Sequence, residues 1–316
     1  MSLIDVRDLA RTFVVRTRTG RFGRTRTAVE AVRDLTFGID AGEMVGYIGP
    51  NGAGKSTTVK MLTGILVPTS GHLRVAGLEP SSQRTDLARR IGVVFGQRTT
   101  LWWDLPLRDS FELLQKIYRV DPARHRRNLQ EYVDLLDLGG LLDTPVRQLS
   151  LGQRMRGDIT AALLHDPEIL YLDEPTIGLD VVSKGRLREF LRTLNTERGT
   201  TLMLTTHDLQ DIEALCDRVI VIDHGTTVFD GPLSELHRRG GSRRTLVVDL
   251  VDEAPPIEVP GAWTRKVQGP RQWLSFPAGE SATPIVSAVA AAYAVADLSI
   301  QEPDIEDVIR DIYAGA

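Results

Sequence analysis

The chain has 316 residues, of which 42% are hydrophobic and 25% are charged, a balance typical of a soluble globular protein with one large α/β domain and a smaller second one. The net charge of −4 gives no indication of nucleic-acid binding, and the sole cysteine, Cys216, excludes an intramolecular disulfide. The most apolar stretch, residues 285–296, is shorter than the ~20 residues of a membrane helix, and the N-terminus does not resemble a signal peptide, so we expect any membrane contact to be made through another chain.

Residues 1–15 alternate in polarity as a strand does, and residues 28–48 return to that pattern. Between them, residues 16–27 carry five arginines among threonines and glycines, which predicts an exposed loop or the tip of a hairpin. A solvated loop is the ordinary explanation of such a charge cluster, and contact with anionic lipid headgroups or an acidic partner is the alternative.

The second strand-like segment ends in an apolar run at Ile48. A glycine-rich segment, Gly49–Thr57, follows it, and a helical pattern then runs to Leu66. Two further strands are predicted at residues 73–75 and 91–95, and residues 105–165 are expected to be mainly helical, with leucine-rich amphipathic runs.

From residue 169 onward, strands and helices alternate, with strands at 169–172, 201–205 and 219–222 and helices at 183–196 and 209–215. This alternation favours an α/β fold with a mainly parallel sheet. A break in composition at 238–242 separates a domain of residues 1–240 from a small α+β appendage, residues 241–316, with two strands, an alanine-rich helix and a last amphipathic helix around 305–312.

The segment Gly49–Thr57 fits the pattern G-x-x-x-x-G-K-[ST], and it lies where that pattern has physical meaning, between a strand and a helix. Glycines allow backbone N–H groups to approach phosphate oxygens, and the helix N-terminus adds positive potential. The lysine reaches the β- and γ-phosphates and the serine is a ligand for Mg²⁺. The residues expected to bind the nucleotide here are Gly49, Asn51, Gly52, Gly54, Lys55, Ser56 and Thr57.

Two carboxylates, Asp173 and Glu174, follow the apolar strand at 169–172. The C-terminal ends of parallel strands line the ligand crevice of such a sheet. Asp173 is therefore a candidate ligand for Mg²⁺, and Glu174 is a candidate acceptor of a proton from water. The alternative is an acidic turn after a strand, which the nearby phosphate loop makes less attractive.

The run Leu149–Gln153 resembles the signature sequence of the ATP-binding cassette family, usually Leu-Ser-Gly-Gly-Gln. Other motifs of that family follow in family order. Gln97 resembles the Q-loop glutamine, Gly178-Leu179-Asp180 resembles the D-loop, and His207 resembles the switch histidine. Phe13 stands where the family places an aromatic ring to stack on adenine. The resemblance implies a P-loop nucleotide-binding domain with a helical subdomain at about residues 100–165.

One residue departs from the family pattern, because Leu151 replaces the first glycine of the signature. Ser150, Gly152 and Gln153 remain, and in the family this segment binds the γ-phosphate held by the opposite subunit. A leucine side chain that points away leaves its N–H free to donate, so we expect a working site. The close approach of backbone to phosphate is what the change puts in question.

The resemblance further implies a mechanism in which two copies of the chain dimerise head to tail around ATP and Mg²⁺. Glu174 acts as general base or orients water, and His207 holds the γ-phosphate. Gln97 contacts Mg²⁺ beside Ser56 and Asp173, and Asp180 reaches across the dimer. Positioning and charge stabilisation supply most of the catalytic effect in such phosphoryl transfers.

Cassette ATPases include transporter subunits and soluble proteins that act on nucleic acid or ribosomes. The single cassette and the stretch Gly96–Pro106 are similar to bacterial drug- and antibiotic-export ATPases, whose permeases are separate chains. This favours an exporter subunit at the cytoplasmic face of the membrane, attached only through its permease, with no nucleic-acid partner expected. The soluble alternative remains open at this point.

Trp102 and Trp103 follow the Q-loop, where the family receives a coupling helix from the permease. They are either anchors of that interface or part of the core of the helical subdomain. The appendage, residues 241–316, carries no motif with a chemical mechanism, and we expect it to regulate the ATPase or to help it dimerise.

Overall fold

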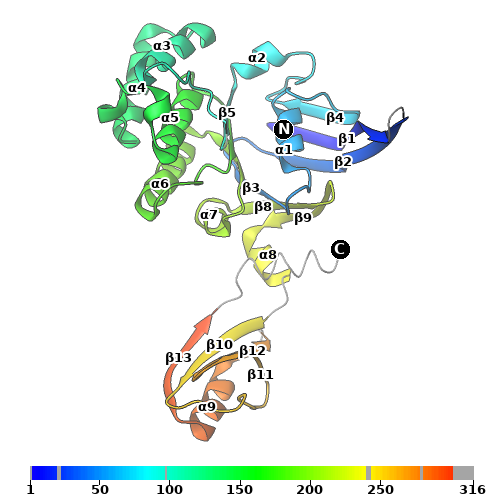
Figure 1. Cartoon of the computed structure of the whole chain (residues 1–316), viewed down its shortest axis with the longest axis vertical. Coiled ribbons are helices and arrows are strands. Elements are labelled where there is room, and N and C mark those ends of the chain that lie inside the picture. Colours follow the sequence, from blue (N-terminus) through cyan, green and yellow to red (C-terminus); the bar gives the residue numbers. More distant parts are fainter. Residues whose placement is uncertain (1, 20–22, 97, 240–242, 278–279, 302–316) are drawn as a thin grey trace. The chain divides into compact units, whose positions relative to one another are not determined.

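The computed structural model describes residues 2–19, 23–96, 98–239, 243–277 and 280–301. The chain divides into two compact units, Met1–Asp230 and Gly231–Ala316, each of which is described by itself (Figure 1). Within the described ranges, no helix is both long enough and apolar enough to cross a bilayer. Gln97 and the helix expected around 305–312 lie outside the described residues.

A six-stranded sheet forms the centre of the first unit. Its strands are β3 (Met44–Ile48), β5 (Ile91–Phe95), β6 (Ile169–Asp173), β7 (Thr201–Thr205), β8 (Arg218–Asp223) and β9 (Thr226–Pro232). They follow the order β5-β6-β7-β3-β8-β9, and the pairs from β5 to β8 are parallel. Strands β3 and β7 are buried along their whole length, as expected of strands covered on both faces. The predicted α/β class is confirmed.

A second, three-stranded sheet is antiparallel, with β1 (Ile4–Thr19) between β2 (Gly23–Ile39) and β4 (Ser70–Val75). The pairing of β1 with β2 continues as far as Thr19 opposite Gly23. Most of the arginine-rich stretch 16–27 is therefore strand in a long hairpin, and only its tip lies outside the described residues. Of the two predictions for this stretch, the exposed loop is wrong, and the paired strands agree with the hairpin.

The part of this unit that the structure describes has seven α-helices: α1 (Lys55–Leu62), α2 (Arg84–Ala88), α3 (Leu107–Tyr118), α4 (Pro122–Leu135), α5 (Leu151–Leu163), α6 (Val181–Arg198) and α7 (Leu209–Leu215). Helices α3, α4 and α5 gather on one side of β5, away from the three-stranded sheet (Figure 1). They fall in the segment predicted to be helical. Helix α1 ends earlier than the predicted Leu66, because the Gly64 N–H donates to Met61 O at 3.0 Å and closes a turn.

The hydrophobic core joins both sheets through α1. Buried Met61 and Leu62 of α1 pack in one cluster with Tyr47 of β3, Tyr171 of β6 and residues of β1 and β2. The Tyr47 hydroxyl and the Thr58 hydroxyl lie 3.1 Å apart, which adds a polar tie between β3 and α1. The core therefore fixes the strand and the helix that flank residues 49–54.

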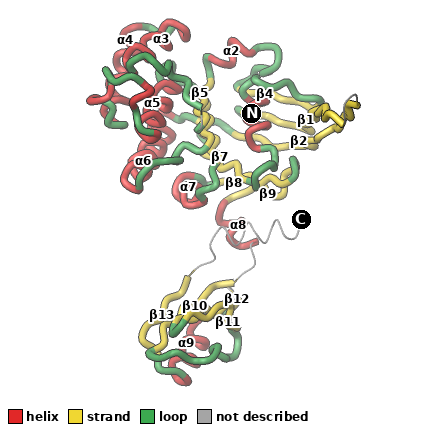
Figure 2. The backbone as a smooth tube through the Cα atoms, viewed as in Figure 1, coloured by secondary structure: helices red, strands yellow, loops and turns green. Residues whose placement is uncertain are grey.

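Among its described residues, the second unit contains a four-stranded antiparallel sheet in the order β11-β12-β10-β13 and two helices (Figure 2). Its elements are α8 (Leu233–Arg239), β10 (Arg243–Leu250), β11 (Trp263–Gln268), β12 (Arg271–Pro277), α9 (Ala282–Ala292) and β13 (Val295–Gln301). Ile285 and Val289 of α9 pack against Leu274 and Phe276 of β12 in a separate core. Strands β11 and β13 were not predicted, because their residues are largely exposed and carry no clear alternation.

Candidate functional site

The phosphate loop, residues 49–57, turns between the end of β3 and the first turn of α1. Gly54 caps the helix with φ +105°, a conformation that favours glycine, and a Cβ there would lie 2.5 Å from Ala31 O. The first N–H groups of α1 have no partners within the helix and carry partial positive charge. The loop therefore presents donors and positive potential to an anion, as the sequence pattern predicts.

The ammonium of Lys55 is held over this loop. Its Nζ donates to Gly49 O at 2.5 Å and to Pro50 O at 3.2 Å. Burial lowers the pKa of Lys55, while the nearby carboxylates of Glu174 and Asp173 act in the opposite direction. The lysine thus lies between the loop and the carboxylate pair, where its ammonium group could also donate to a phosphate.

The carboxylate pair lies at the C-terminal end of β6. Asp173 ends the strand, and one of its oxygens accepts a hydrogen bond from the Thr205 hydroxyl at the end of β7. Glu174 follows with φ +55°, a strained value for a residue that is not glycine, and its N–H donates to Thr205 O at 2.8 Å. The turn directs two adjacent carboxylates to one edge of the sheet.

His207 completes this edge from the segment after β7. Its Nδ1 lies 2.6 Å from Glu174 Oε2, while its side chain is 75% exposed and that of Glu174 only 21%. The next residue, Asp208, caps α7 and receives Lys184 Nζ of α6 at 2.5 Å. The histidine ring therefore contacts one carboxylate, its chain neighbour Asp208 is fixed to α6 and α7, and most of the His207 side chain is exposed.

A cavity of about 550 Å³ joins the phosphate loop to the carboxylate pair. Its lining includes eight residues that the sequence predicted for nucleotide binding, metal binding or catalysis: Asn51, Gly52, Gly54, Lys55, Ser56, Thr57, Asp173 and Glu174. Hydroxyl and carboxylate oxygens are the ligands that Mg²⁺ takes beside substrate phosphates, so the donor set of Ser56 and Asp173 fits this ion.

The sequence interpretation missed two cations in the lining, Lys60 and Arg98. Lys60 lies four residues after Ser56 on α1, so helical periodicity alone places it on the same face. Arg98 follows Gln97, and its N–H closes a turn with Phe95 O at 2.9 Å. Both add positive charge to a cavity that already suits a polyphosphate.

Phe13 lies outside this lining. It belongs to β1, opposite Val29 of β2, and the guanidinium of Arg11 lies 4.7 Å from the centre of its ring. One face of the ring is therefore covered by a cation, and the stacking on adenine stays a prediction.

The signature, Leu149–Gln153, forms the N-terminus of α5. Ser150 caps the helix by accepting from the Gln153 N–H at 3.2 Å, and the Gln153 side chain accepts from the Ser150 N–H at 2.9 Å. Asp180 caps α6 in the same way, accepting from the N–H and the hydroxyl of Ser183. Neither cap lines the cavity, so one chain does not bring the signature to its own phosphate loop.

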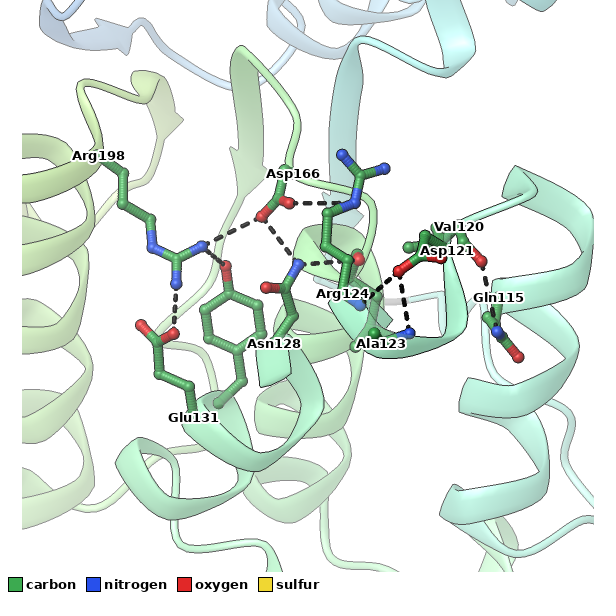
Figure 3. Close-up of polar contacts among 11 residues, drawn as sticks. Gln115, Val120, Asp121, Ala123, Arg124, Asn128, Glu131, Asp166 and Arg198 are labelled. Atoms are coloured by element: carbon green, nitrogen blue, oxygen red, sulfur yellow. Dashed lines mark hydrogen bonds and ion pairs between the residues drawn. The ribbon is translucent and has the colours of Figure 1, made fainter. Parts of the chain in front are cut away.

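A second cavity of about 550 Å³ lies at the opposite edge of the sheet, beside the beginnings of β6 and β7. Asp166, just before β6, accepts from Asn128 Nδ2 of α4 at 2.9 Å and pairs with Arg198 at the end of α6 at 3.1 Å (Figure 3). Arg198 also reaches the Tyr132 hydroxyl and Glu131 of α4. These side chains bond to one another, and their common effect is to fasten α4 to the sheet.

Trp102 and Trp103 remain 37% and 48% exposed. The guanidinium of Arg154, on α5, lies 4.6 Å from the centre of the Trp103 ring, and Trp103 O accepts from the Arg147 N–H at 3.0 Å. Arg154 and Arg147 thus hold Trp103, and both tryptophans remain partly exposed to solvent, which disagrees with their assignment to the core.

Asp158 is a buried carboxylate that the sequence interpretation missed. Its Oδ1 accepts from the Thr100 N–H at 2.8 Å, the Thr99 hydroxyl at 2.9 Å and the Thr100 hydroxyl at 3.1 Å. Because Asp158 lies on α5, it ties the helix that begins at the signature to the segment after Gln97. An aspartate in the middle of an otherwise apolar helical face is the only signal of it in the sequence.

Comparisons with known proteins agree with this geometry. A family model described as ABC transporter matches residues 32–177. The ABC transporter ATP-binding protein NatA of Bacillus subtilis (strain 168) is 33% identical over 217 residues, which are 69% of this chain and 88% of that protein. The daunorubicin/doxorubicin resistance ATP-binding protein DrrA of Streptomyces peucetius is 38% identical over 67% of this chain and 64% of that protein.

The fold also resembles a solved structure, the dimeric post-hydrolysis state of an ATP-binding cassette bound to ADP and Pi. The TM-score is 0.63 at 26% identity, and the match covers 73% of this chain and 98% of that one.

Substitution of Asp158 tests how the buried carboxylate contributes to the free energy of unfolding. Asp158→Ala leaves three donors without an acceptor, and we expect a loss of about 1–3 kcal/mol in chemical denaturation. Burial raises the pKa of Asp158, so its favourable contribution is complete at low pH and is lost as the pH rises from 3.8 through the folded pKa. The stability of Asp158→Asn relative to the parent should therefore increase over that range. Exposed Asp252→Asn is the control, and a parallel pH dependence of the two variants would contradict the assignment.

Proposed function

We propose that this chain, which belongs to the ABC transporter family of ATP-binding proteins, binds and hydrolyses ATP as the nucleotide-binding subunit of an exporter. The observation that carries the proposal is the cavity in which Lys55 lies between the phosphate loop and the Asp173–Glu174 pair. The drug-resistance relative supports the exporter assignment by its name.

The phosphate loop would bind the β- and γ-phosphates through its backbone N–H groups and Lys55. Ser56 and Asp173 would hold Mg²⁺, with Gln97 as a further ligand. Bound there, the ion neutralises charge on the phosphates. Phe13 would contact the adenine from β1, and Arg98 and Lys60 add positive charge to the same cavity.

Glu174 would accept a proton from the attacking water or orient it, and His207 would hold the γ-phosphate. Their 2.6 Å contact supports this pairing, because each fixes the orientation of the other. The strained φ of Glu174 supports a functional constraint at this residue. Both groups act on the γ-phosphate end of a nucleotide whose other phosphates lie on the loop.

A second copy of the chain would complete the site, with Ser150, Gly152 and Gln153 of one copy facing the nucleotide of the other and Asp180 crossing between them. The dimeric structure of the similar cassette supports this arrangement. Apolar side chains that border the two caps are exposed in the single chain, at 42% for Leu151, 85% for Val181 and 66% for Val182. Such surface is typical of an interface.

Transport would be driven through separate membrane permease subunits that hold the ATPase at the cytoplasmic face. The exposed apolar surface of Trp102 and Trp103 supports a contact there, since exposed aromatic residues are frequent anchors of interfaces. Residues 241–316 would serve as an accessory domain that regulates the ATPase or helps it to dimerise.

The lysine of the phosphate loop is tested by Lys55→Ala. The variant loses a charge-assisted bond to phosphate, and we expect ATP affinity to fall by about 10- to 100-fold in isothermal titration calorimetry. Lys116→Ala, at an exposed position of α3, is the control. Wild-type affinity in Lys55→Ala would contradict the assignment of the phosphate loop.

The catalytic carboxylate is tested by Glu174→Gln, which keeps the shape of the side chain but cannot accept the proton. ATP binding should persist, steady-state hydrolysis should fall by about 100-fold or more, and an ATP-dependent dimer should accumulate in size-exclusion chromatography. Exposed Glu112→Gln is the matched control. Normal turnover in Glu174→Gln would remove this residue from its role.

The permease contact is tested by Trp103→Ala in the assembled transporter. Melting temperature and basal ATPase should remain near those of the parent, because the ring is half exposed, while transport is lost. Ile117→Ala, another exposed apolar side chain of the helical subdomain, should leave transport intact. A large drop in melting temperature with unchanged coupling would instead assign Trp103 to packing.

A further inference from the structure

The leucine that departs from the family signature packs against the D-loop of its own chain. A Cβ placed on Gly178 would lie only 2.3 Å from Leu151 Cδ2 and 2.9 Å from its Cγ. Leu151 therefore fills the space that the missing side chain of Gly178 leaves. Gly178 has φ +72°, so both its conformation and this contact require glycine.

The contact is reciprocal. A Cβ placed on Gly152 would lie 2.7 Å from Leu179 Cδ2. Each segment thus offers one leucine and one glycine, and each leucine covers the glycine of the other. Such interdigitated contacts resist sliding, because either leucine would have to leave its place before the segments could shift.

The D-loop is also tied to the catalytic carboxylate. The Ile177 N–H donates to Glu174 O at 3.3 Å, and the Leu179 N–H donates to Thr176 O at 3.2 Å, so two consecutive turns lead from Glu174 to Leu179. The Thr176 hydroxyl is fixed in turn by fully buried Asp211, at 2.5 Å. The middle of the D-loop, at Gly178 and Leu179, is where the signature makes its contact.

We propose that Leu151 is a positioning residue that locks the signature to the D-loop of the same chain. The caps of α5 and α6, Ser150 and Asp180, are then presented to the partner copy as one rigid surface. Glu174, which serves the nucleotide of its own chain, is connected through the same turns to the signature that serves the partner. This inference rests on the proposed function for its consequence in catalysis, and on packing alone for the contact.

The first test measures the contact without nucleotide, by hydrogen–deuterium exchange of the full-length chain. In Leu151→Ala the Leu179 amide should exchange about tenfold faster, because the side chain that holds the turn is gone. Leu151→Met, which restores the volume, should exchange like the parent, and so should Leu135→Ala, a leucine of similar exposure on α4. Unchanged exchange in Leu151→Ala would overturn the inference, whether or not the chain hydrolyses ATP.

The second test separates positioning from stability by kinetics. In Leu151→Ala, kcat should fall about tenfold with ATP affinity unchanged, since small displacements of catalytic groups slow reactions strongly while Lys55 is untouched. Leu151→Met should recover most of the activity. A wild-type kcat in Leu151→Ala would contradict the positioning role. An inactive parent chain would contradict the proposed function, and the exchange measurement would still decide the contact.

A double-mutant cycle with Asp180→Ala tests whether Leu151 acts through the D-loop. If Leu151 acts by placing the D-loop, Leu151→Ala should add little to the loss already caused by Asp180→Ala. Losses that multiply would show that Leu151 acts elsewhere on the dimer surface, and the inference would fail.

Discussion

The parallel pairing of β6 with β7 and of β7 with β3 is the constraint on which the candidate site depends. Asp173 lies opposite Thr205, and Gly46 opposite Leu204, so the three strands end at the same edge of the sheet. Each strand then delivers one chemical group to that edge: the phosphate loop after β3, the carboxylates after β6 and the histidine after β7. Buried strands shift register only at great cost, so these groups stay together.

Most of this edge could be predicted from the sequence, because it depends on short-range features. The phosphate loop is a contiguous pattern, and Asp173 and Glu174 follow a contiguous apolar run. The helix and strand bounds from 169 to 222 were close for the same reason. Helix α1 ended early because the hydrogen bond at Gly64 overrides a pattern that continues to be apolar.

What could not be predicted lies in contacts between segments that are far apart in the chain. Nothing in the local pattern of Asp158 indicates that Thr99 and Thr100 will bond to it, nor does Leu151 indicate Gly178. The sequence of β11 does not predict a strand, because this segment is extended through its pairing with β12 and not through a pattern of its own. Tertiary contacts of this kind require the packed fold, and sequence periodicity does not contain them.

The packing of Leu151 also shows how a leucine in place of the usual signature glycine affects a possible anion site. The sequence left open whether a side chain at position 151 allows the backbone to approach a phosphate closely. In the structure that side chain lies on the D-loop, while Ser150 and Gln153 form a complete capping box at the helix N-terminus. The capping box occupies the N–H groups of Ser150 and Gln153 but not those of Leu151 and Gly152, which lie at the positive end of α5. The change therefore adds a contact without removing these two donors. A signature altered in this way gains stiffness relative to its neighbour, and stiffness is useful where one surface must meet a nucleotide bound by another chain.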